Sequence, residues 1–325
     1  MRHVFKLVFL FVGVVIGAGF ATGSEIVLYF KNSGYLSVLL ASCIMGLLSV
    51  VFCLFGRLQN KYKWAKNLLK IVVFLSSCVT YCIMLSGVGE LIYTQFGIKY
   101  FGIVTAFVVA ILMLYDMRLI KLLNLVIVPM IVVIMLIILI VSGGQIYAGL
   151  NLSSSLKYAG MNMLLGGYFM SEEGDTLSAK QIALTGCLVA IIMGLLMSIC
   201  YTISMQATGS NMPVFEVARS FGLGSLAAVV VYLAIFTTLI GSGRAFSDMI
   251  LKILPNKFVV FLLCFVLGFY FDGLDFGDVV AFSYGMIGEI GLVVCVFIVC
   301  ILIVEMLRSI KNKIKIKNNK LKTLI

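Results

Sequence analysis

The sequence predicts an all-α integral membrane protein. Of its 325 residues, 62% are apolar, 11% are charged and only three are proline. A soluble domain of this length does not have enough interior to bury so much apolar surface. Charge-free apolar runs also recur along the chain, and an α-helix needs about 20 such residues to cross a bilayer. The chain is therefore expected to cross a membrane many times.

The apolar runs predict ten spans. In chain order they are residues 7–30, 34–56, 71–95, 100–115, 118–142, 152–170, 181–205, 222–243, 258–271 and 279–304. Ten spans divide into two sets of five, and an odd number per set places the second set upside down relative to the first. We therefore expect one transmembrane domain, residues 1–306, made of a 5+5 inverted repeat. The repeats cover about 4–142 and about 152–306.

The basic residues favour ten spans with both chain ends in the cytoplasm. With the N-terminus inside, 20 of the 24 lysines and arginines fall on the inner side and four on the outer side. Short cytoplasmic loops retain positive charge, so this asymmetry supports the count. Residues 307–325 form a basic cytoplasmic tail, expected to lie on anionic headgroups of the bilayer. The net charge of +11 belongs to these loops, and we expect no nucleic-acid binding.

Several other classes are not favoured. Residues 1–23 have the basic start and apolar run of a cleavable signal peptide, but the apolar pattern resumes at Ile26 and cleavage would break the charge topology. All nine cysteines fall within expected spans and the single histidine is His3, so we expect neither disulfides nor a metal site. Motifs for phosphate binding, zinc proteolysis and serine hydrolysis are absent from the sequence. We expect no enzyme and no cofactor.

The first span is unusual for a membrane helix. Between Gly13 and Glu25 it contains four glycines, a threonine and a serine. Glycine lets the backbone leave the helix, and freed backbone groups at membrane depth are tolerated only inside protein or beside a water-filled cavity. We expect a break whose amides attract an anionic substrate group. The substrate-binding residues expected here are Gly17, Ala18, Gly19, Phe20 and Thr22.

The sixth span is the expected inverted counterpart of the first. It is short and contains a Gly-Gly pair and Asn162, which is costly to bury in a membrane. Interrupted spans at matching positions of two repeats indicate a transporter's binding site, so we expect this span to be broken too. Close helix packing through small residues is the alternative explanation of its glycines. From the third and sixth spans, the expected substrate-binding residues are Tyr81, Gly160, Asn162 and Tyr168.

The run from Ile16 to Ile26 resembles the start of the YkvI-like bacterial membrane proteins. These in turn resemble the amino acid, polyamine and organocation (APC) transporter superfamily with the LeuT-type inverted repeat. The resemblance implies a bacterial plasma-membrane transporter, with a substrate pocket between the broken first and sixth spans and beside the third and eighth. It also implies a sodium site, whose matching positions are Gly13, Ile16, Ala234, Thr237 and Thr238. Threonine hydroxyls that bond to the carbonyl one turn earlier are the alternative.

Two carboxylates interrupt the outer halves of spans. Glu25 lies about 10 Å outside the midpoint of the first span, and Glu289 interrupts the tenth. Neither has an obvious basic partner in the outer halves. A buried membrane carboxylate is expensive and often functional, so we expect proton coupling or gating from both. A water-exposed rim is the alternative.

The expected function is secondary transport of a small organic solute, an amino acid by the resemblance. Substrate and coupling ion, either sodium or a proton, bind between the broken spans, and one bundle rocks against the rest. A transporter-like sensor that binds a solute without net transport is the second hypothesis. The sequence does not determine the oligomeric state.

Overall fold

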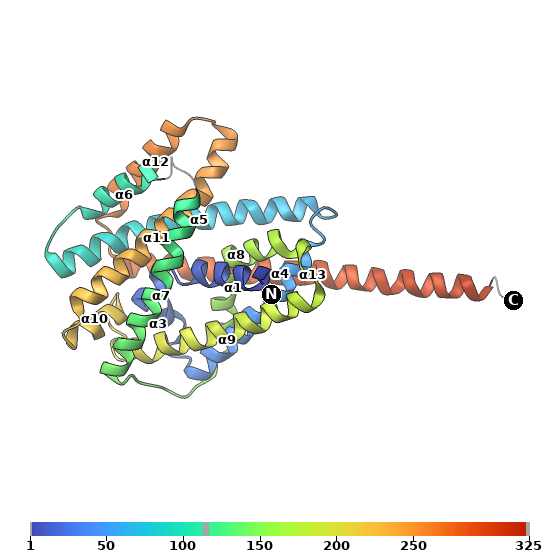
Figure 1. Ribbon diagram of the computed structural model, residues 1–325, viewed down its shortest axis with the longest axis horizontal. Helices are drawn as coiled ribbons and strands as arrows, with labels where there is room; N and C mark the ends of the chain where they lie inside the picture. The colour runs from blue at the N-terminus through green and yellow to red at the C-terminus, as the bar shows by residue number, and fades with distance from the viewer. Residues whose placement is uncertain (1, 113–116, 323–325) are drawn as a thin grey trace.

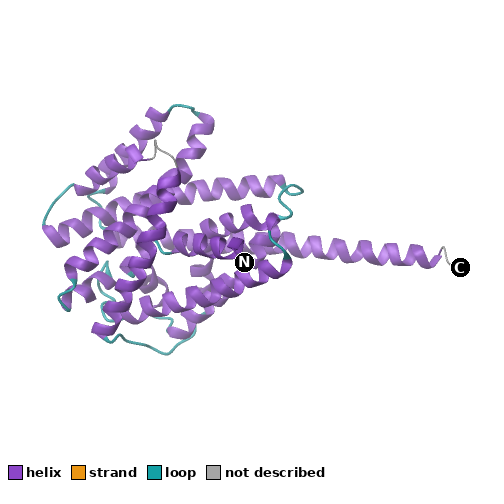
Figure 2. Ribbon diagram, viewed as in Figure 1, coloured by secondary structure: helices purple, strands orange, loops and turns teal. Residues whose placement is uncertain are grey.

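The computed structural model describes residues 2–112 and 117–322, in which every regular element is a helix (Figure 2). Every expected span coincides with a helix over its described residues, and the first coincides with three consecutive pieces. Residues 113–115 of the fourth span lie outside the described ones. The helices are α1 Arg2–Val15, α2 Ala18–Thr22, α3 Ser24–Phe30, α4 Tyr35–Gly56, α5 Lys63–Phe96, α6 Phe101–Leu112, α7 Met117–Ser142, α8 Leu152–Glu173, the 3-10 turn η1 Gly174–Thr176, α9 Ala179–Ser204, α10 Pro213–Ser220, α11 Gly224–Ile253, α12 Lys257–Phe271 and α13 Phe276–Lys322.

Within the part of the chain that the structure describes, five helices are long and apolar enough to cross a membrane by length and composition: α4, α5, α9, α11 and α13. Shorter apolar helices occur at His3–Val15, Phe101–Leu112, Pro129–Ser142 and Lys257–Phe271. The short helix α10 occupies the loop that the sequence places between the seventh and eighth spans.

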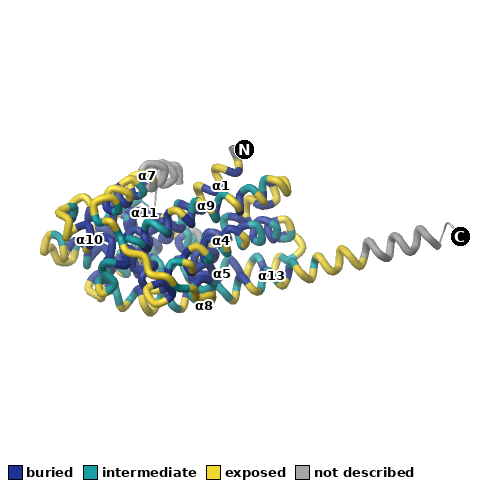
Figure 3. The backbone as a smooth tube through the Cα atoms, turned by 90° about the horizontal axis from the view of Figure 1, so that it is seen from below, coloured by how far each residue is buried: buried dark blue, intermediate teal, exposed yellow. Residues whose placement is uncertain are grey.

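Helices distant in sequence pack in pairs. α4 packs against α8 and α9, α1 packs against the same two helices, and α5 packs against α11. α6 and α12 lie together at one corner of the molecule (Figure 1). Buried backbone concentrates where these helices meet (Figure 3). Small residues permit the close approach: a Cβ placed on Gly46 of α4 would lie 2.6 Å from the carbonyl oxygen of Gly186 on α9.

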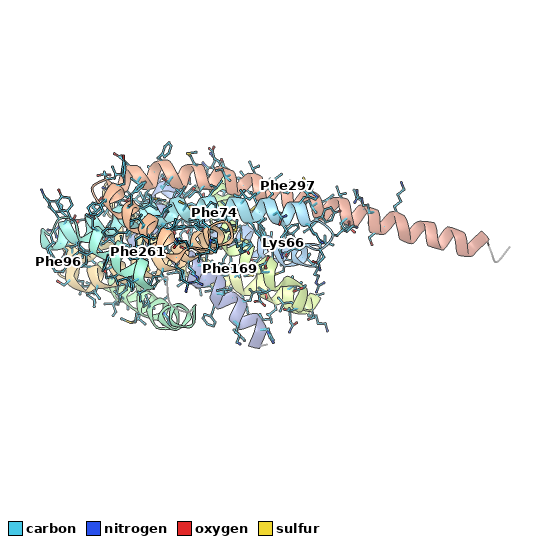
Figure 4. All side chains as sticks on the ribbon, turned by 90° about the horizontal axis from the view of Figure 1, so that it is seen from above. Lys66, Phe74, Phe96, Phe169, Phe261 and Phe297 are labelled. Atoms are coloured by element: carbon cyan, nitrogen blue, oxygen red, sulfur yellow. The ribbon has the colours of Figure 1, made fainter. Side chains whose placement is uncertain are left out.

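Two long helices set the length of the molecule. α5 has 34 residues, which corresponds to about 50 Å of helix. Its residues Lys66 and Phe96 lie toward opposite ends of the body (Figure 4). α13 continues as a helix beyond the body (Figure 1). The basic tail expected at 307–325 is therefore helical through Lys322, and residues 323–325 lie outside the described ones.

The expected break in the sixth span is a wrong prediction. α8 is one continuous helix, and its glycines serve packing instead. A Cβ on Gly166 would lie 2.5 Å from the Phe11 ring, and one on Gly167 would lie 2.6 Å from the Phe52 ring. Glycine permits a helix to open but does not require it, because an unbroken membrane helix keeps all its backbone hydrogen bonds. Close approach of neighbouring helices is what these glycines provide.

Candidate functional site

The first span is broken as expected, and it is broken twice. α1 ends before Gly17, which has extended backbone angles (φ −96°, ψ −166°), and the five-residue α2 follows. A second interruption falls at Gly23, whose φ of +79° is a left-handed conformation. A residue with a Cβ adopts that conformation only at a cost of about 1–2 kcal/mol. The sequence predicted one break, and the structure divides the span into three pieces.

The first interruption lies against α11. A Cβ placed on Gly17 would lie 2.8 Å from Oγ1 of Thr238. Thr237 and Thr238 both donate to the carbonyl oxygen of Ala234, at 3.0 and 2.9 Å. The back-bonded arrangement described as the alternative is therefore present. Hydroxyl and carbonyl oxygens are the ligand types that hard cations prefer. Of the expected sodium ligands, Thr238 and Ala234 thus lie close to the break.

The two expected ligands on α1 lie in and just after its last turn. The amide of Ile16 donates to the carbonyl oxygen of Val12 (2.8 Å), and the amide of Gly17 donates to that of Val15 (2.7 Å). Gly13 is one turn before the break. The helical hydrogen bonds thus end at Ile16, and a γ-turn bond at Gly17 follows before the chain extends.

The second interruption places a carboxylate inside the protein. Glu25 is the second residue of α3, and only 4% of it is exposed. Tyr158 of α8 donates from its hydroxyl to Oε1 of Glu25 (3.3 Å). A Cβ on Gly19 would lie 2.9 Å from Oε2 of Glu25 and 2.7 Å from the ring of Tyr284 on α13. The absence of a side chain on Gly19 is what allows both groups to lie there.

A third tyrosine completes this arrangement. Tyr29, one turn after Glu25, donates from its hydroxyl to the carbonyl oxygen of Tyr284 (2.5 Å). Its ring meets the Tyr158 ring edge-on, with centroids 5.5 Å apart. Each of the four residues is at most 8% exposed. We call Glu25, Tyr29, Tyr158 and Tyr284 the carboxylate–tyrosine cluster.

Sequence reasoning found the carboxylate of this cluster and missed its tyrosines. Glu25 and Tyr29 are four residues apart, the spacing of one helical face, which is a signal that was available. Nothing in the sequence around Tyr284 indicates a contact with the first span, and for Tyr158 only the expected pairing of the first and sixth spans does. Those contacts depend on how α8 and α13 pack against α3.

The two expected functional carboxylates have different environments. Among the described residues, Glu25 makes no ion pair. Glu289 pairs with Lys157 at 2.9 Å, and their side chains are 66% and 38% exposed. The expectation that Glu289 has no basic partner was therefore wrong, because the start of α8 lies beside α13. The exposed position agrees with the rim alternative for Glu289 and not for Glu25.

Asn162 and Thr22 lie near the cluster. Asn162 donates from Nδ2 to the carbonyl oxygen of Tyr158 (3.1 Å). Thr22 donates from its hydroxyl to the carbonyl oxygen of Gly19 (3.1 Å). Phe20 is fully buried. Ala18 begins α2, and its side chain lies outside the described ones.

The remaining expected substrate residues have other contacts. Tyr81 donates from its hydroxyl to the carbonyl oxygen of Cys264 on α12 (3.3 Å), and its ring packs on Phe246 of α11. Gly160 packs against the backbone of α13, where its Cβ would lie 2.5 Å from the amide nitrogen of Leu292. Tyr168 is half-buried beside Phe169. The structure therefore gives these three residues packing contacts with neighbouring helices or side chains.

No group of three or more histidine, cysteine, aspartate or glutamate side chains is arranged to hold a metal ion in the part of the chain that the structure describes.

The fold and the site together define an α-helical membrane protein with an interrupted first span. Two Bacillus subtilis (strain 168) proteins are similar to the chain. "Uncharacterized membrane protein YkvI" is 22% identical and aligns over 88% of this chain and 92% of its own length. "Uncharacterized protein YyaD" is 22% identical over 94% of this chain and 98% of its own length. The resemblance noted at the first span thus extends over most of the chain.

A solved structure and the family models complete the comparison. The crystal structure of a mutant of the Eremococcus coleocola manganese transporter has a TM-score of 0.49 and 14% identity, and it covers 90% of this chain and 77% of that one. No protein-family model matches the chain.

Proposed function

We propose that the protein is a secondary active transporter of a small organic solute, with an amino acid as the expected substrate. One observation carries the proposal: the first span leaves the helix twice, and a carboxylate is buried beside the second interruption. Irregular backbone at membrane depth is tolerated only inside protein or along a cavity. Buried ionisable groups in membrane spans typically lie on substrate or ion pathways. Both features are expensive in a protein that only anchors or packs.

We propose further that the ten spans form two inverted repeats. In such a repeat each span of the first five corresponds to the span five places later. A contact between the third and eighth spans is then its own symmetry mate, and so is a contact between the fourth and ninth. In the structure α5 packs against α11 and α6 packs against α12. The same correspondence converts the contact of α1 with α9 into that of α8 with α4, and both contacts are present. These pairings support the proposal, and alternating access follows from rocking one set of helices against the other.

A sodium ion is one candidate for the driving ion. Oxygen ligands suit hard cations, and Thr238 brings a hydroxyl to the interruption at Gly17. The double change Thr237→Ala and Thr238→Ala is expected to abolish sodium dependence of transport. Thr185→Ala is the matched control, because Thr185 is a buried threonine of α9 that also bonds to a carbonyl one turn earlier. Equal sodium dependence in all three proteins would contradict this site.

The decisive experiment is uptake of labelled amino acids into proteoliposomes, with sodium and proton gradients imposed separately. Concentrative uptake under either gradient supports the transporter. Saturable binding of a labelled amino acid with no flux under either gradient would contradict it and favour the sensor hypothesis.

A further inference from the structure

A buried carboxylate without a described cationic partner needs a compensating charge. Moving an ionised carboxylate out of water is unfavourable unless it is paired with a cation or takes up a proton. Glu25 is 4% exposed, and no described lysine or arginine forms an ion pair with it. A cation or proton that binds to the Glu25 carboxylate would therefore determine the net charge at this position.

The groups that face Glu25 are polar and carry no formal positive charge. Tyr29 lies on its own helix, Tyr158 donates from α8, and Tyr284 lies on α13. Cys200 of α9 directs its thiol to the carbonyl oxygen of Phe20 (3.2 Å). α2 has no titratable side chain, and on α4 Tyr35 directs its hydroxyl to Ser198. These are the helices that make the main contacts with α3.

The cluster is closed. Its four side chains are at most 8% exposed, and the space beside Gly19 is filled by Glu25 and Tyr284 to within 3 Å of a Cβ position, at 2.9 and 2.7 Å. An organic ammonium or a hydrated metal ion requires room that this packing does not provide. A proton requires none. The packing therefore favours the smallest cation.

The cluster also borders an exposed ion pair. Tyr29 lies one helical turn after Glu25 on α3. Gly288, beside Glu289, leaves room for the Tyr29 hydroxyl, which a Cβ at that position would overlap. The pair of Glu289 with Lys157 is open to solvent. Tyr29 thus separates the buried carboxylate from an exposed ion pair.

We propose that Glu25 binds the coupling proton and exchanges it with the outer side past Tyr29 and the ion pair of Lys157 with Glu289. The step forms one O–H bond on the carboxylate with a proton taken from outer water, and that bond breaks when the proton leaves. This inference rests on the proposed transporter, because only a coupled carrier uses the proton as its driving ion. It selects the proton over sodium for this site.

The test reads protonation directly, without a solute. Infrared difference spectra of the purified full-length protein in lipid, recorded while the pH is stepped, detect the carbonyl band of a protonated carboxylic acid. We expect a titrating band component that Glu25→Gln removes and that Glu216→Gln, at an exposed carboxylate of α10, retains. If Glu25→Gln does not fold, Tyr158→Phe serves instead, since loss of its hydrogen bond is expected to shift the pH at which the band appears. A band unchanged in Glu25→Gln, or unshifted in Tyr158→Phe, overturns the proposal.

Two further measurements distinguish failure of the proton site from failure of the proposed transport. At constant pH, addition of sodium chloride or methylammonium chloride should leave the Glu25 band unchanged; its loss would assign the site to those cations instead. Solute flux that sodium alone drives and Glu25→Gln does not alter would overturn proton coupling and leave the transporter intact. A Glu25 proton band together with no flux of any amino acid would contradict the proposed transport and leave the proton site intact.

Discussion

The first span and the sixth contain similar glycine-rich segments and have opposite structures. The first is divided into α1, α2 and α3, whereas α8 runs without interruption through Gly160, Gly166 and Gly167. The interruptions occur where the backbone is extended, at Gly17, and left-handed, at Gly23. The α8 glycines instead face aromatic rings and the backbone of α13. Glycine content in a membrane span therefore indicates either a break or a close contact, and the neighbouring helices decide between them.

The largest expected effect is at the second interruption. Gly23→Ala forces a left-handed backbone on alanine, and its Cβ would overlap Ser204 and lie 2.9 Å from Val214. We expect a loss of about 3 kcal/mol, from about 1–2 for the backbone and about 1–3 for overpacking. Thermal unfolding in detergent measures the loss.

Gly222→Ala is the control for this change. Gly222 has a similar φ of +77°, but a Cβ there would meet no described atom within 4 Å. Only the backbone cost of about 1–2 kcal/mol is expected. Equal losses in the two variants would show that Gly23 is selected by its backbone angle alone.

The second prediction concerns close packing in α8. Gly160→Ala would bring a Cβ to 2.5 Å from the backbone nitrogen of Leu292. Separation of α8 from α13 should cost about 1–3 kcal/mol, reduced by the better helix propensity of alanine. Gly285→Ala on α13, with open space around its Cβ, should be neutral or stabilising. A stabilised Gly160→Ala protein would show that α8 and α13 do not approach each other this closely at Gly160.

The third prediction sharpens the difference at the first interruption. Gly17→Ala places a methyl group 2.8 Å from Oγ1 of Thr238, whereas Thr238→Ala removes that oxygen. The double variant should therefore be more stable than the sum of the single losses, with a coupling free energy of about 0.5–3 kcal/mol. Thermal unfolding of the wild type, the two single variants and the double variant gives the free energies from which this coupling is calculated. Additive losses would place the break away from α11.

The smallest effect is expected at the exposed ion pair. Lys157→Met removes the partner of Glu289, and because both side chains are substantially exposed the stability should change by about 1 kcal/mol or less. The change should shrink further in high salt, since exposed charges are screened. A larger, salt-independent loss would show that the pair is buried when the first span rearranges.

Much of the fold was predictable because the length of an apolar run can be read from consecutive residues. Each expected span after the first coincides with one helix in the described residues, and the four glycines between Gly13 and Glu25 correctly predicted an interrupted first span. The site was predictable only in part. Glu25 was identified from its cost in an apolar segment, but Tyr284 approaches it from a helix more than 250 positions later, as its contact with Tyr29 shows. Contacts at that separation leave no periodic signal.

The sequence by itself determined that the chain is a helical membrane protein, because apolar composition and run length settle which solvent the helices need. It also determined where the backbone of the first span can leave the helix, because glycine lowers the free-energy cost of non-helical backbone angles. Only the tertiary structure decided that α8 remains whole, since the rings of Phe11 and Phe52 and the backbone of α13 occupy the space beside its glycines. Likewise, only packing separated the carboxylates: Glu289 pairs with Lys157 at the surface, and Glu25 is enclosed by tyrosines from three helices.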